Sequence, residues 1–245
     1  MNRGRTSWLA GLVCLLLSGT NALQAGPGIP PFDARYRIER SIFDIGRIQL
    51  RFYISPTGNY VYHSTTEVAG FIAWFRDDRV EETSRGSMDA RGIRPGLYHF
   101  ERRGGKGDKR AAVSFDWTAA QVENTVNGES WRMAIPQGTL DKLVVQIAMM
   151  RRLQDTVQDQ HFRVADGGKL KDFRIHVLAH ETLEVPAGNF DTIKVEKTPE
   201  SGSRKTYLWL APVLGYLPVQ IMRIENDGAS YYSVLESVSD SLRVK

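Results

Sequence analysis

The amino-acid sequence predicts a mainly β protein: a single large antiparallel curved sheet, either a half-barrel or a barrel, with one main α-helix packed on it. Three observations support this fold class. Apolar and polar residues alternate over many short segments, as in strands with one buried face. Turn residues separate these segments at short intervals, which favours an antiparallel meander. One segment, 139–154, instead repeats its apolar residues every three or four positions, as an α-helix does.

The strands that precede this segment show the alternation most clearly at 47–54. Its sequence, RIQLRFYI, places aliphatic and aromatic residues on one face and mostly polar residues on the other. Ser55–Asn59 (SPTGN) then predicts a turn into the next strand. By the same pattern we expect strands at 32–41, 47–54, 60–68, 78–88, 96–102, 111–116, 121–126 and 129–135.

The predicted helix covers residues 139–154. Thr139 follows Pro136 and Gly138 and is a suitable N-cap. The apolar residues of the segment fall on one stripe, which predicts that the helix lies with this stripe on the sheet.

A second set of strands follows the helix. We expect a hairpin of 181–185 and 190–197 around a four-residue turn, Pro186–Asn189. Proline lacks the amide hydrogen, and glycine and asparagine tolerate positive φ, so the turn residues do not continue a paired strand. Glu225–Gly228 (ENDG) is another hairpin turn. The remaining strands are expected at 161–164, 172–180, 206–210, 215–224 and 230–237.

The first 25 residues have the pattern of a secretory signal peptide. Arg3 and Arg5 precede an apolar run at 8–17, and cleavage is expected after Ala22 or Ala25. We therefore expect a single domain at 26–245 and a periplasmic location. The one cysteine, Cys14, lies inside the signal, which excludes a disulfide, a thiolate nucleophile and a Cys–zinc site from the mature chain.

The charge of the mature chain gives no reason to expect a nucleic acid as partner. Loss of the two signal-peptide arginines reduces the formal net charge from +4 to about +2. The sequence also contains no zinc finger, RRM signature or basic helix. Beyond the signal, no apolar run approaches the length of a membrane-spanning helix, so we do not expect an integral membrane protein.

No set of residues in the sequence indicates catalysis. His176 and His180 are four apart on an expected strand, about 13 Å along it, which is too far to share one metal ion without a bend. The sequence lacks a Gly-x-Ser-x-Gly elbow and a phosphate-binding glycine loop in the right context. We therefore expect no catalytic residue, metal or cofactor, and a protein that is not an enzyme.

Two apolar segments are the candidates for ligand binding. Residues 70–75 (GFIAWF) are continuously apolar before an abrupt charged run, and 207–210 (YLWL) is apolar on both faces. The first is either a buried edge or short helix, or a loop that offers aromatic side chains to an apolar ligand. The second is either a central strand under the helix or the lining of a cavity. The predicted ligand-binding residues are Phe71, Trp74, Phe75, Tyr207 and Trp209.

Three segments, taken together, resemble a bacterial family of unknown function, DUF3108. They are GTLDKLVVQIAMMRRL at 138–153, ETLEVPAGNFDTIKVEK at 181–197 and YLWLAPVLGYLPVQIMRIENDG at 207–228. GIRPGLYHFERR at 92–103 and SFDW at 114–117 add to the resemblance. The resemblance implies an exported protein, mostly of Gram-negative bacteria, and implies no established activity.

The ending of the chain is also similar to that of the LolA and LolB lipoprotein carriers. Here Trp209-Leu210 and Pro212 precede Leu217-Pro218-Val219 and a closing hairpin. This fold-level resemblance implies a curved half-barrel whose mouth is covered by helices and which binds acyl chains. The present chain departs from that pattern because only one long helix is expected.

These observations predict a non-enzymatic periplasmic protein that binds an apolar or amphipathic, lipid-like ligand in cell-envelope maintenance. The first alternative is an envelope protein-interaction or scaffold module whose edge strands pair with a partner protein. The second alternative is a hydrolase that acts on glycan or lipid, which would require paired carboxylates in a pocket.

Overall fold

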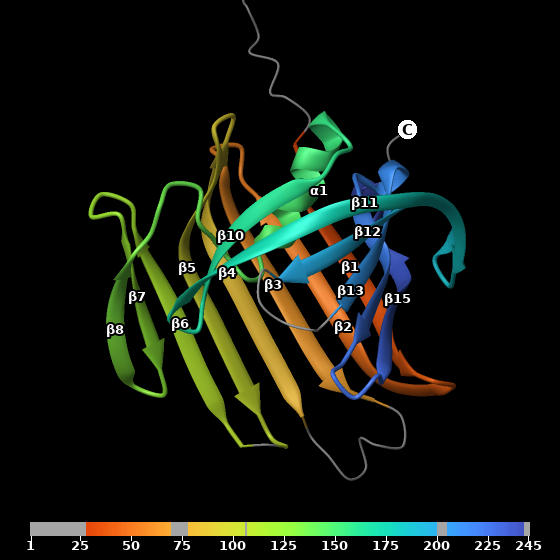
Figure 1. Ribbon diagram of the computed structural model, residues 1–245, viewed down its shortest axis with the longest axis horizontal. Coiled ribbons are helices and arrows are strands. Elements are labelled where there is room, and N and C mark those ends of the chain that lie inside the picture. The colour runs from red at the N-terminus through yellow and green to blue at the C-terminus, as the bar shows by residue number, and fades with distance from the viewer. Residues whose placement is uncertain (1–27, 70–77, 106, 200–204, 243–245) are drawn as a thin grey trace, which may run out of the picture.

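The computed structural model describes residues 28–69, 78–105, 107–199 and 205–242. All its strands belong to one 15-stranded sheet, in the order β8-β7-β6-β5-β4-β3-β2-β1-β15-β14-β13-β12-β11-β10-β9. Neighbouring strands are antiparallel except for β9 and β10, which are parallel. β8 and β9 are the two edges of the sheet. The curved sheet is therefore not closed into a barrel. The predicted mainly β fold with one α-helix is confirmed (Figure 1).

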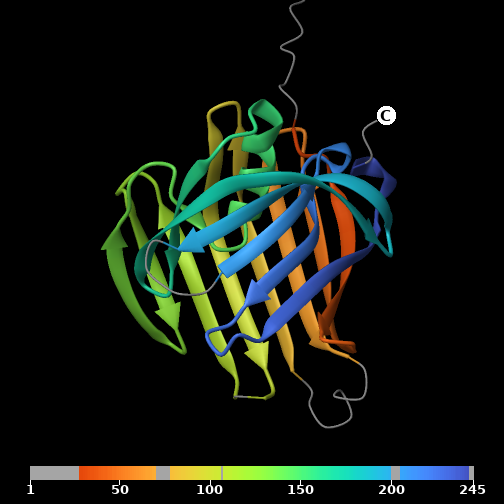
Figure 2. The ribbon, with the colours of Figure 1, turned by 45° about the vertical axis from the view of Figure 1, so that its right-hand side comes forward.

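The chain forms two halves of this sheet, which meet where β1 pairs with β15. The first half contains β1 (Phe32–Arg40), β2 (Phe43–Ile54), β3 (Asn59–Val68), β4 (Arg79–Asp89), β5 (Gly92–Arg103), β6 (Lys109–Asp116), β7 (Gln121–Val126) and β8 (Glu129–Ala134). The second half contains β9 (Leu140–Asp141), β10 (Gln160–Asp166), β11 (Lys169–Val185), β12 (Gly188–Pro199), β13 (Lys205–Ala211), β14 (Leu217–Ile224) and β15 (Ser230–Val238). The helix α1 (Val145–Asp155) lies between the two halves (Figures 1 and 2), and short 3₁₀ helices cover Pro212–Leu214 and Asp240–Leu242.

The helix begins later than its periodicity predicts. It covers Val145–Asp155 rather than 139–154. Leu140 and Asp141 instead form β9, where they pair with Val164 and Ala165 of β10. A local helical period does not reveal this pairing, because the partner strand is about twenty residues away.

Two other boundaries differ from expectation at turns. The β11–β12 hairpin closes with a Val185–Gly188 pair, so its turn contains two residues, Pro186 and Ala187, rather than four. The strand expected from residue 215 begins at Leu217. Gly215 and Tyr216 both have positive φ, at 59° and 65°, and therefore form a turn after the 3₁₀ helix rather than extended strand.

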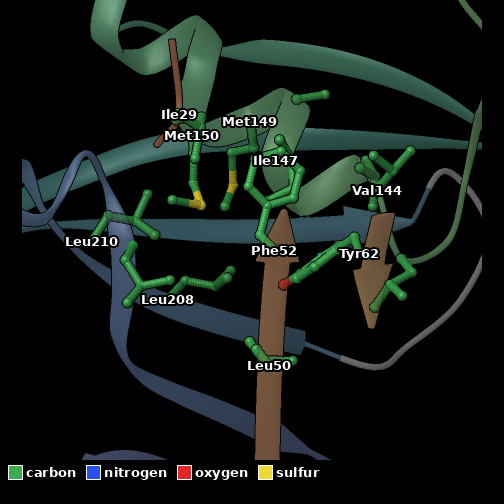
Figure 3. Packing of buried hydrophobic residues seen from close by; sticks show 14 of the residues in the cluster. Ile29, Leu50, Phe52, Tyr62, Val144, Ile147, Met149, Met150, Leu208 and Leu210 are labelled. Atoms are coloured by element: carbon green, nitrogen blue, oxygen red, sulfur yellow. The ribbon is translucent and has the colours of Figure 1, made fainter. Parts of the chain in front are cut away.

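The core lies on the concave face of the sheet, around α1. Four aromatic side chains from β1, β2 and β3 pack against one another there: Phe32, Phe52, Tyr60 and Tyr62. Ile147 and Met150 of α1 are fully buried between these rings and the leucines of β13 (Figure 3). The apolar stripe of α1 is thus buried against the sheet, as the sequence predicts, and it contacts both halves.

The turn between β10 and β11 approaches the far edge of the first half. Gly168 has a φ of +74°, and a Cβ atom built on it would lie 2.3 Å from Nε1 of Trp131 in β8. A larger residue at 168 would therefore collide with the indole ring. This close approach brings the β10–β11 hairpin to β8 although no strand pairing closes the sheet.

Candidate ligand-binding site

An apolar pocket of about 170 Å³ lies between α1 and the concave face of the second half. Val145 and Met149 line it from the helix, and side chains of β10, β11, β13 and β14 line it from the sheet. The sheet residues are Phe162, Phe173, Ile175, Thr206, Leu208 and Ile221. A mostly apolar concavity with a few polar groups is the usual form of a small-molecule site, although its volume is below the range of about 300–1,000 Å³ for drug-sized ligands. The pocket therefore has room for a short apolar chain.

Lys197 of β12 is the main charged group in the wall of this pocket. Its Nζ atom lies 4.3 Å from the ring centroid of Phe173, in a cation–π contact. No carboxylate among the described residues forms an ion pair with it. Burial, together with the positive charge of nearby Arg223, lowers the pKa of Lys197 from 10.5 to about 8, while Asp166 opposes the shift. Lys197 is thus a partly buried cation without an ion-pair partner among the described residues.

Lys142 lies at the opposite wall of the pocket and does have partners. Its Nζ atom lies 3.0 Å from Oε1 of Glu82 and 4.2 Å from the ring centroid of Phe100. Tyr98 donates a hydrogen bond of 2.5 Å to the same oxygen of Glu82. Lys142 is therefore held to the first half of the sheet, whereas Lys197 forms no ion pair with a described carboxylate.

Asp141 anchors the segment before α1 to the first half. Its fully buried carboxylate accepts a hydrogen bond of 2.6 Å from Oγ of Ser84 in β4. The backbone N–H groups of Leu143 and Val144 donate to its other oxygen, at 2.9 Å each. Because Ser84 donates its proton to Asp141, the hydroxyl of Tyr60, 3.0 Å away, donates to Ser84.

Burial raises the pKa of Asp141 from 3.8 to about 6, against the opposing effect of these three hydrogen bonds. Nearby Glu82 also raises the pKa. The network therefore contains a carboxyl group that changes protonation near pH 6. All three donors point at the Asp141 carboxyl group. The role of the network in this arrangement is therefore to fix the start of α1 against β4.

Of the five residues predicted from the sequence to bind a ligand, the structure describes two. Phe71, Trp74 and Phe75 lie outside the described residues. Tyr207 and Trp209 lie on β13, on the face opposite to Leu208. Nε1 of Trp209 donates to Oε2 of Glu181 at 2.8 Å, and Nζ of Lys194 lies 4.9 Å from its ring centroid. The role of these five residues in ligand binding stays a prediction, while the neighbouring Leu208 lines the pocket.

The two pocket lysines were not selected from the sequence. A signal for Lys197 was present, because it ends the alternating run in which Ile193 and Val195 mark the buried face of β12. A lysine on such a face is unusual. No comparable signal exists for Lys142, since its environment depends on how β9 meets β5.

The described part of the chain contains neither a metal-ligand cluster nor a membrane-spanning helix. Within it, no three His, Cys, Asp or Glu side chains come together in a way that could hold a metal ion. None of its helices has the length and hydropathy needed to cross a membrane.

Comparison with known protein families agrees with the sequence resemblance. The model of DUF3108, a family described as proteins of unknown function, matches residues 32–234. The chain belongs to the DUF3108 family. No curated protein matches this DUF3108 chain in sequence.

Solved structures with a similar fold extend the comparison. A β-barrel-like protein of the family DUF1849 from Brucella abortus superposes with a TM-score of 0.57 at 10% identity, over 87% of this chain and 98% of that one. A protein from Bacteroides fragilis, described as exported and as having a YmcC-like fold, has a TM-score of 0.39 at 15% identity, over 88% and 98% of the two chains. The first of these supports the β-barrel-like fold of this DUF3108 protein.

Proposed function

We propose that this DUF3108 protein binds an anionic amphiphile in the bacterial periplasm, without catalysing a reaction on it. In this proposal the apolar chain of the ligand occupies the pocket between α1 and the second half of the sheet. The acidic head group pairs with Lys197. The signal-like segment 1–25 supports the periplasmic location.

The single observation that carries the proposal is the combination of an apolar pocket with an unpaired cation in its wall. An apolar pocket favours an apolar ligand because burial removes the apolar surface of the ligand from water. A partly buried ammonium group without a counter-ion is unfavourable, and a bound carboxylate or phosphate would supply one. An uncharged lipid would fill the apolar pocket but would not supply a counter-ion to Lys197.

Gln146 adds a second polar group to the same pocket. Its Nε2 atom is buried and has no hydrogen-bond partner among the described residues, and its side chain lines the pocket from α1. An unsatisfied buried amide donor costs about 1–3 kcal/mol. A ligand with an acceptor oxygen at this position would recover part of that cost.

Titration calorimetry with decanoate and decanol tests the proposal. We expect the wild type to bind decanoate more tightly than decanol, and Lys197→Met to weaken decanoate about tenfold while binding decanol at least as well. Lys194→Met is the matched control, because Lys194 lies on the same strand but on the outer face. Decanoate affinity of the wild type should also fall above pH 8, where Lys197 loses its proton.

The possible results separate the parts of the proposal. Equal binding of decanoate and decanol, unchanged by Lys197→Met, would retain the apolar pocket and contradict the acidic head group. A wild-type protein that binds neither compound would contradict the ligand-binding function. The unpaired edge of β8 would then favour the interaction module, in which a partner strand adds to the sheet.

A further inference from the structure

A second pocket, of about 340 Å³, lies on a different side of α1. The turn at Ala90–Arg91 between β4 and β5, the turn at 137–138 before β9, and the last two turns of α1 form its walls. The helix contributes Ala148 and Asp155 here, whereas Val145 and Met149 face the apolar pocket. Four arginine side chains line this second pocket, which we call the arginine pocket: Arg91, Arg94, Arg151 and Arg152.

Two of the four arginines already have acceptors. Arg91 pairs with Asp89 of the same turn, with Nη2 2.8 Å from Oδ2. Arg152 donates from Nη1 to the carbonyl oxygen of His161 at 2.8 Å and lies over the ring of Phe162. A cation in the last turn of a helix is also favoured by the helix dipole, so ordinary structural roles explain Arg152.

Arg94 and Arg151 have no such explanation. Neither guanidinium forms an ion pair or a hydrogen bond with any described residue. Nη1 of Arg151 is buried without a hydrogen-bond partner. A buried charged donor without an acceptor is costly, and two guanidinium groups that line one pocket also repel each other. Asp155 is the one carboxylate that lines the pocket.

We propose that the arginine pocket binds a phosphate group, either free in solution or on a lipid head group, with Arg94 and Arg151 as its ligands. The planar guanidinium group presents paired N–H donors that match the oxygens of a phosphate. An anion would give the buried Nη1 atom an acceptor and would screen the repulsion between the two cations. This site does not depend on the proposed amphiphile, which would occupy another side of the helix.

The test uses the full mature chain at low ionic strength, with inorganic phosphate and pyrophosphate as soluble probes in titration calorimetry. Flotation with phosphatidylcholine vesicles, with and without phosphatidic acid, tests the lipid source.

The variants are Arg151→Gln and Arg94→Gln. Arg132→Gln is the matched control, because Arg132 is an exposed arginine of β8 that pairs with Glu123. Thermal melting monitored by circular dichroism confirms that each variant is folded.

We expect each pocket variant to weaken binding about tenfold and the control to leave it unchanged. Binding of the soluble probes alone assigns the site to a free phosphate compound. Binding that requires phosphatidic acid in the vesicles assigns it to a lipid head group. The proposal is overturned if the wild type binds neither source, or if Arg132→Gln weakens binding as much as Arg94→Gln does. Arg94 lies on an exposed part of β5, so this variant tests the site even if Arg151→Gln does not fold.

Discussion

The surroundings of Asp141 and of Lys197 differ in how a buried charge is satisfied. Asp141 receives three hydrogen bonds, from Ser84 and from two backbone N–H groups, so protein groups complete its environment. Lys197 has an aromatic ring beside it and no carboxylate partner among the described residues. A charge that the protein satisfies itself serves the fold, whereas a charge without a described partner beside an apolar pocket is the basis of the proposed ligand site. On this comparison, Asp141 has a structural role, and Lys197 is the residue that we propose for ligand binding.

The largest expected effect comes from removing the Asp141 network. Asp141→Ala leaves two N–H groups and the Ser84 hydroxyl without their acceptor, so we expect the free energy of unfolding to fall by about 4 kcal/mol. Urea denaturation measures this loss. Asp191→Ala is the control, because Asp191 is an exposed carboxylate whose loss should cost no more than about 0.5 kcal/mol. A similar small loss for both variants would mean that Asp141 does not anchor the start of α1.

A smaller effect on stability is expected from protonation of the Asp141 carboxyl group. The folded carboxyl keeps its proton to a higher pH than the unfolded one, because its pKa is about 6 in the folded protein and 3.8 in the unfolded chain. Its contribution to stability is therefore complete below about pH 4 and is lost as the pH rises through 6. Asp141→Asn removes this dependence, so the wild type should lose about 3 kcal/mol relative to the variant across that window. Denaturation at a series of pH values measures the difference, and two parallel curves would contradict a raised pKa.

Lys197 should cause a weaker pH dependence of stability than Asp141, with the opposite sign. Its lowered pKa means that the folded protein holds this proton less strongly than the unfolded chain does. Stability should therefore increase as the pH rises from about 8 to 10.5. Lys197→Met should stabilise the ligand-free protein at pH 7 by about 1–2 kcal/mol, after allowance for partial exposure, and this gain should disappear at high pH.

Urea denaturation of Lys197→Met and Lys194→Met at pH 7 and pH 10 measures this effect. A variant that is more stable yet binds decanoate less well would show that Lys197 is kept for binding. If Lys197→Met is less stable than the wild type at both pH values, the side chain belongs to the fold, and the contrast with Asp141 does not hold.

Much of the fold could be predicted because it depends on short-range patterns. Alternation in RIQLRFYI indicated β2, and the same pattern located the other strands to within a few residues, except for β9, which was predicted as helix, and β11, which was predicted as two strands. The first turn of the predicted helix was wrong, because Asp141 both pairs with β10 and caps the backbone at Leu143 and Val144. Both interactions compete with helical hydrogen bonds, and the pairing partner on β10 lies in a distant part of the chain.

The candidate sites could not be predicted in the same way. The sequence directed attention to Tyr207 and Trp209, whereas Leu208 between them faces the pocket. Aromatic content signals buried surface but does not distinguish the concave from the convex face of a sheet. Arg94 and Arg151 gave no signal, because 57 positions of chain separate two residues that line one pocket.

The sequence by itself determined the strands, most of their turns, the presence of one helix and the family. Each of these depends on residue spacing within about a dozen positions, where the period of 2 or 3.6 and the turn residues act directly. The curvature of the open sheet decided the rest. It places β9 beside β5 and α1 between the halves, and so determines that Asp141 is satisfied, that Lys197 is not, and that two distant arginines share a pocket. Local spacing contains no information about these contacts, because they depend on how far the whole sheet turns on itself.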